Sequence, residues 1–129
     1  METPAHNVVG WFEIPVLDME RAINFYEQVF NFKLQRETVE HIDMAWFPWV
    51  DNAIGAGGSL VCMPEYYKPS ADGTIVYFTA FSGDLAIELE RAKTAGGHVI
   101  MEKRLITEEI GYMGIFLDTE GNKIALHSK

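Results

Sequence analysis

The chain has 129 residues, of which 48% are hydrophobic, with only 5 Pro and 11 Gly. This suits one globular domain and excludes a disordered chain. The formal net charge of −9 makes nucleic acid and anionic membranes poor partners, because their phosphate groups would be repelled. The single cysteine, Cys62, excludes an intrachain disulfide and a CxxC site. No apolar run approaches the about 18 residues of a membrane span, and the start lacks a secretory signal, so we expect a cytoplasmic protein.

Residues 8–16 form an apolar run interrupted by one carboxylate, which predicts a strand. Side chains alternate between the two faces of a strand. One face then carries Phe12, Ile14 and Val16, and the other carries Trp11, Glu13 and Pro15. If the first set packs against a helix, Trp11 and Glu13 face a cleft.

A helix follows this strand, and the same pattern occurs again later in the chain. Asp18 is the expected N-cap, and Asn31 suits the left-handed residue that ends a helix. In the second half, residues 74–81 predict a strand, Asp84 an N-cap and Gly97 a helix end. Asp84 follows Asp18 by 66 residues, and Gly97 follows Asn31 by 66 residues. The chain therefore contains an internal repeat.

Each half reads as a strand, a helix and several further strands. Residues 41–47 and 59–63 complete the first half, and residues 115–118 and 123–127 complete the second. We expect an α+β fold of two βαβββ modules, at about 8–63 and about 74–128, within a single domain spanning 1–129. One module alone cannot cover both faces of its sheet, so the two should form a partial barrel around a cleft.

Three segments resemble the vicinal oxygen chelate superfamily, which includes glyoxalase I, bleomycin-resistance proteins and extradiol dioxygenases. The first is carried by Phe12, Ile14-Pro15-Val16, Asp18, Ala22, Phe25-Tyr26 and Val29-Phe30. The second, residues 76–97, fits the opening of the second module. The third, residues 116–126, is similar to the last hairpin, usually Asp-Pro-x-Gly-Asn, with Thr119 here in place of the proline. The resemblance covers about the whole chain, and it implies a fold more firmly than a reaction.

The resemblance also implies where a metal would bind. Family enzymes hold one divalent ion through His, Glu or Gln side chains on the first and fourth strands of each module. The matching positions here are Trp11, Tyr77 (or Val76 after a shift of one residue), Ala125 and the stretch 57–63, where Cys62 is the only conceivable ligand. An indole, a phenol, a methyl group and one thiol do not hold a first-row ion. We therefore predict that the metal site is lost and that no metal cofactor is bound.

The leading hypothesis is a metal-free binding protein or enzyme that takes a small organic molecule of unknown identity. Trp11, Cys62, Tyr77 and Phe116 are predicted to wall the cleft. Glu13 is the candidate catalytic base, or the anchor for an amine or hydroxyl group of the ligand. The alternative for Glu13 is a structural carboxylate bonded to a neighbouring strand or an arginine.

His127 is the second polar candidate, since it shares a strand face with Ala125. It could pair with Glu13 as an acid/base couple, form a two-ligand metal site, or lie near solvent at the end of the chain. The metal-site reading would suit a metal-dependent lyase or dioxygenase. A third hypothesis is a drug-sequestering protein of the bleomycin-resistance kind, because negative charge and aromatic walls suit a flat cationic ligand. The aromatic residues Trp46, Phe47 and Trp49 have three possible places: the cleft, a subunit contact or the core. We expect a homodimer, because the resemblance implies it: short relatives commonly pair.

Overall fold

The computed structural model describes residues 2–129 as two four-stranded sheets and two helices. The elements in chain order are β1 (Trp11–Pro15), α1 (Met19–Phe30), β2 (Gln35–Val39), β3 (Ile42–Trp46), β4 (Gly57–Cys62), β5 (Val76–Thr79), α2 (Leu85–Thr94), β6 (His98–Thr107), β7 (Gly111–Leu117) and β8 (Lys123–Ser128). This order confirms the α+β fold of two βαβββ units, β1 to β4 and β5 to β8. The sheets do not close into a barrel, in agreement with the expected open arrangement.

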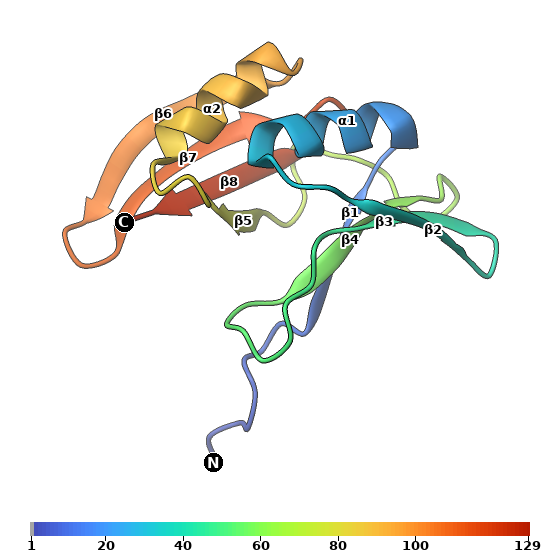
Figure 1. Ribbon diagram of the computed structural model, residues 1–129, viewed down its shortest axis with the longest axis horizontal. Coiled ribbons are helices and arrows are strands. Elements are labelled where there is room, and N and C mark those ends of the chain that lie inside the picture. Colours follow the sequence, from blue (N-terminus) through green and yellow to red (C-terminus); the bar gives the residue numbers. More distant parts are fainter. Residues whose placement is uncertain (1) are drawn as a thin grey trace.

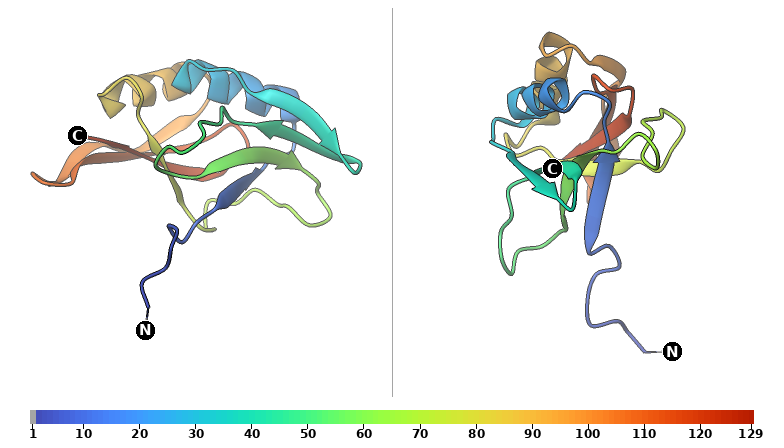
Figure 2. Two further views of the ribbon diagram at one scale, coloured as in Figure 1. Left: turned by 60° about the horizontal axis from the view of Figure 1, so that its bottom comes forward. Right: turned by 90° about the vertical axis from the view of Figure 1, so that its right-hand side faces the viewer.

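The two sheets share one topology. Their strand orders are β1-β4-β3-β2 and β5-β8-β7-β6. In each, the first strand pairs parallel with the fourth, while the other pairs are antiparallel. Both helices lie on the same side of the sheets (Figure 1), and the turned view in Figure 2 agrees. Neither of the helices in residues 2–129 is long and apolar enough to cross a membrane.

The helix boundaries follow from their capping residues. Asp18 has extended backbone, and its carboxylate accepts a hydrogen bond from the Arg21 N–H. Asp84 does the same for the Ala86 N–H. Asn31 ends α1 in the left-handed conformation, at φ 57°. These three predicted caps are confirmed.

A single aromatic core joins the two units. Phe25 and Phe30 of α1 contact Phe116 and Phe78 of the second sheet, with ring centroids 5.6 Å and 4.7 Å apart. Tyr26 also packs on Phe78, at 5.9 Å. The helix of the first unit thus packs against strands of the second as well as against its own sheet. This packing sets the distance between the units.

The turn between β7 and β8 fastens the second unit to the start of α1. One oxygen of the Glu120 carboxylate accepts hydrogen bonds from the backbone N–H groups of Leu17 and Asp18, at 2.8 and 2.9 Å. The other accepts from Arg21 Nε at 2.7 Å. Burial alone would raise the pKa of Glu120, but these bonds and one from Thr119 lower it to about 2. A charged Glu120 therefore caps a helix of the other unit.

The same turn carries a buried polar cluster. The Tyr26 hydroxyl donates a hydrogen bond of 2.6 Å to Asp118. Asn122 Nδ2 donates to Asp118 and, at 2.8 Å, to the backbone carbonyl of Pro15. Burial raises the pKa of Asp118, although the hydrogen bonds from Tyr26 and Asn122 oppose that effect. Together these bonds hold β1, α1 and the end of β7 in fixed positions around the inter-unit space.

Candidate aromatic site between the two units

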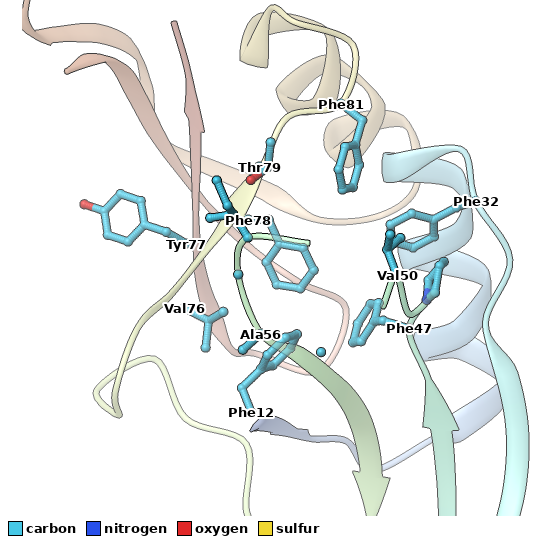
Figure 3. A pocket seen from close by; sticks show the side chains of 14 residues that line it. Phe12, Phe32, Phe47, Val50, Ala56, Val76, Tyr77, Phe78, Thr79 and Phe81 are labelled. Carbon is cyan, nitrogen blue, oxygen red and sulfur yellow. The ribbon is translucent and has the colours of Figure 1, made fainter. Parts of the chain in front are cut away.

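A pocket of about 270 Å³ opens between the two units. It is lined by Phe12, Phe32, Phe47, Pro48, Val50, Ile54, Gly55, Ala56, Gly57, Val76, Tyr77, Phe78, Thr79 and Phe81. Figure 3 shows phenyl rings from both units around this space. Strands β1 and β5 and the loop before β4 therefore supply its walls.

The phenyl rings meet because β1 and β5 present them on the helix-facing side of each sheet. Phe12 and Phe78 are 5.6 Å apart in an edge-to-face arrangement. Phe47 lies 5.4 Å from Phe78, and Phe32 lies 6.2 Å from Phe81. Such tilted contacts are the favoured geometry of aromatic pairs. Phe78 follows Phe12 by 66 residues, so the repeat itself brings these two rings together.

The loop before β4 forms the exposed rim of the pocket. Val50 and Ile54 are largely or wholly exposed, at 67% and 100%, and Phe81 opposite them is 69% exposed. The loop can fold back on β4 because Gly57 has no side chain, and a Cβ atom there would overlap the Trp49 ring. The rim thus consists of apolar side chains that contact water.

The predicted residues Trp11 and Glu13 lie on the far side of the first sheet, away from the helices. Their strand neighbours in register are Gly57 and Ser59. Trp11 packs edge-on against Trp46 of β3, with centroids 5.8 Å apart. Glu13 is exposed, and its carboxylate beside the Tyr67 hydroxyl raises the pKa of that phenol.

Tyr77 and His127 lie on the far side of the second sheet. The sequence left Tyr77 and Val76 as alternatives for one position. Tyr77 is in register with Ala125, whereas Val76 faces the helices beside Ile124, so Tyr77 is the residue on the far side. Tyr77 borders the pocket, but its ring turns away from the phenyl rings (Figure 3), and its hydroxyl lies 3.9 Å from Met113 Sδ. His127 Nε2 lies 2.6 Å from the Ile110 carbonyl oxygen. Glu13 and His127 each have a different partner and do not form the predicted couple.

Cys62 and Phe116 are not on the far side with Trp11 and Tyr77, so the structure corrects the expected cleft wall. Phe116 is fully buried beside Phe25 in the core. Cys62 packs against the core, with its Sγ 3.7 Å from the Leu17 carbonyl oxygen, and burial raises the pKa of its thiol. Both residues occur in strands that are apolar on both faces. In such strands the alternation of polar and apolar residues does not show which side chains face the core.

Comparison with known proteins agrees with this architecture. A model of the Glyoxalase/Bleomycin resistance protein/Dioxygenase superfamily matches residues 8–126. The chain belongs to this superfamily. No curated protein matches the sequence.

Several solved structures resemble the chain in fold. Glyoxalase I from Zea mays superposes with a TM-score of 0.67 at 19% identity, over 92% of this chain and 44% of that one. A hypothetical protein from S. aureus gives 0.69 at 16% identity, over 97% and 96% of the two chains. FosX, a fosfomycin resistance protein from Listeria monocytogenes, gives 0.64 at 16%, over 98% and 93%. This chain thus spans about half the length of the Zea mays enzyme.

The side chains at the positions where superfamily enzymes are expected to hold a metal are poor metal ligands in this chain. The in-register pairs at the expected positions are Trp11 with Gly57 and Tyr77 with Ala125. None of these four side chains is a carboxylate, an imidazole or a thiolate, which are the usual ligands of first-row metals. Within the described range 2–129, no three His, Cys, Asp or Glu side chains cluster in a way that could hold an ion.

The sequence interpretation missed most of the pocket. Of its six candidate site residues only Tyr77 lines this space, together with Phe47 from the aromatic group for which the cleft was one of three alternatives. Phe12 was expected on the helix-facing side of its strand, where it indeed lies together with Phe78, but that side opens into a pocket between the units. Their shared repeat spacing could have indicated that two equivalent rings meet.

Proposed function

We propose that this protein is a glyoxalase-like small-molecule-binding protein whose function does not depend on the metal of its superfamily. The observation that carries the proposal is the aromatic pocket between the units. Concave, mostly apolar spaces with a few polar groups are where proteins bind small organic ligands. Trp11, Tyr77 and Ala125 stand at the expected metal positions and are poor metal ligands. This supports a function that does not depend on a metal.

We also propose that the protein pairs as a homodimer in the cytoplasm. Strands β1 and β5 each end a sheet and have one hydrogen-bonded strand neighbour. Large apolar side chains near these edges are exposed, among them Trp11 at 42% and Tyr77 at 51%. A copy related by a twofold axis could cover the exposed apolar side chains near both strands at the same time, which closes the assembly. Sedimentation velocity tests this: a monomer over the whole micromolar range would contradict it.

The metal-independent function is tested on protein produced with iron, zinc, manganese and nickel in the medium and purified without chelator. We expect elemental analysis to find far less than one metal ion per chain. We also expect organic extracts of the purified protein to contain a small molecule, detected by mass spectrometry. Near-stoichiometric metal that dialysis against plain buffer does not remove would overturn the proposal and favour a metal-dependent lyase or dioxygenase.

A further inference from the structure

We infer that the pocket between the units takes an uncharged aromatic ligand of one or two rings; this rests on the proposed small-molecule-binding function. Among the residues of the described chain that line it, none is Asp, Glu, Lys, Arg or His. An ion placed there would lose water without gaining a partner of opposite charge. The net charge of −9 adds a general repulsion of anions.

The volume of the pocket limits the size of the ligand. At about 270 Å³ it exceeds the roughly 150 Å³ of apolar cavities that bind benzene. It lies just below the range of about 300–1,000 Å³ typical of drug-sized ligands. One ring fills part of this space, and two fused rings fill most of it.

The arrangement of the walls favours a flat ring system. Phe12 and Phe47 are each tilted against Phe78, at 75° and 70°. A planar ligand inserted between the units can make stacked or edge-to-face contacts with such rings. Phe81 and Phe32 extend the aromatic surface towards the mouth of the pocket.

The edge of β5 supplies neutral polar groups. All four residues of this strand, Val76–Thr79, line the pocket. Successive side chains of a strand point to opposite faces, so a space that touches all four lies against the strand's edge. That edge is the one without a paired strand, and it offers backbone N–H and C=O groups beside the Thr79 hydroxyl. A hydroxyl, carbonyl or amide on the ligand can form hydrogen bonds with these groups, which carry no net charge to offset the loss of water by an ionised group.

The inference is tested with three ligands of equal ring size and different charge: 2-naphthalenemethanol, 2-naphthoate and 2-naphthalenemethylamine, at pH 7. Binding to the full chain is followed by calorimetry and by the NMR shifts of the Val50 and Ile54 methyl groups. We expect the alcohol to bind at least tenfold more tightly than either ion. Ala56→Phe places a ring in the pocket and should weaken binding of the alcohol at least tenfold. Ala53→Phe, in the same loop but outside the lining, should leave it unchanged.

A second variant acts at the exposed rim, where folding is not at risk. Val50→Asp places a carboxylate beside the pocket and should raise the affinity for the amine relative to the alcohol at least threefold. Val39→Asp, on β2 and outside the lining, is its control.

The possible outcomes separate the inference from the proposed function. If either ion binds as tightly as the alcohol and Ala56→Phe abolishes binding of that ion, the preference for uncharged ligands is wrong. The pocket is then still a ligand site, and the proposed function stands. A preference for the amine in that case would favour a sequestering protein for cationic drugs. If none of the three binds but extracts of the purified protein contain a small molecule, the inference is wrong and the proposed function stands. If none binds and the extracts contain no small molecule, or if Ala56→Phe dissociates a dimer without affecting ligand, the pocket is not a ligand site and both proposals fail.

Discussion

Replacing Glu120 by Gln should weaken the attachment of the second unit to α1. The carboxylate has a pKa of about 2 in the fold against an ordinary value of 4.5. This difference corresponds to about 3 kcal/mol of stability at neutral pH. Arg21 is half exposed, so solvent screening reduces its share of this stabilisation, and the hydrogen bonds from the backbone N–H groups of Leu17 and Asp18 supply the rest. Gln keeps one accepting oxygen but no charge, and we expect Glu120→Gln to lose about 2 kcal/mol of unfolding free energy.

The pH dependence identifies the cause of this loss. A lowered pKa in the fold stabilises the protein above pH 4.5, and this contribution disappears as the pH falls towards 2. We therefore compare the free energies of unfolding of the native chain and Glu120→Gln, measured by urea unfolding with circular dichroism. Their difference should be largest at pH 7 and should shrink below pH 4. The raised pKa of Asp118 acts in the opposite direction but is present in both proteins, so it cancels in the difference. Glu90→Gln, at an exposed carboxylate, should change stability by less than about 0.5 kcal/mol. Equal stability at pH 7, or a difference independent of pH, would refute the reasoning.

Two further substitutions test buried hydroxyl groups by the same urea unfolding. Tyr26→Phe removes a 2.6 Å hydrogen bond to the Asp118 carboxylate and should lower stability by about 2 kcal/mol; no loss would contradict a role for that bond. Ser59→Ala removes a fully buried hydroxyl that lacks a partner among residues 2–129, and should raise stability by up to about 1 kcal/mol. Ser128→Ala is its matched control, because the Ser128 hydroxyl accepts from the Leu85 N–H and its removal should lower stability by about 1 kcal/mol. The same sign for both serine variants would show that hydrogen bonding does not decide the outcome.

The fold could be predicted because its signals are local and occur twice. An N-cap carboxylate, an apolar helix stripe and a left-handed residue at the helix end each constrain a few neighbouring residues. Asp18, Asn31 and Asp84 illustrate this, since each acts as its pattern predicted. The 66-residue spacing then fixed the order of the elements in the second half.

The site was less predictable because it depends on how the units pack. Strand alternation assigned Trp11 and Glu13 to the side away from the helices, which is where they lie. It could not orient Phe116, whose neighbours Ile115 and Leu117 are also apolar. Nor could it indicate that a pocket lies between the units, since this follows from contacts such as Phe30 with Phe78.

The two halves differ at the position three residues before the last strand of each unit. Glu120 and Ile54 are equivalent positions, 66 residues apart and each three residues before the last strand of its unit. Glu120 is buried and caps α1, whereas Ile54 is fully exposed at the rim of the pocket. The start of α2 is capped without Ile54, because Glu88 from its own helix accepts hydrogen bonds from Ser82. With no capping role to fill, the loop before β4 is free to carry apolar side chains to the pocket. The same repeat thus places a structural carboxylate in one unit and an exposed apolar side chain at the pocket rim in the other.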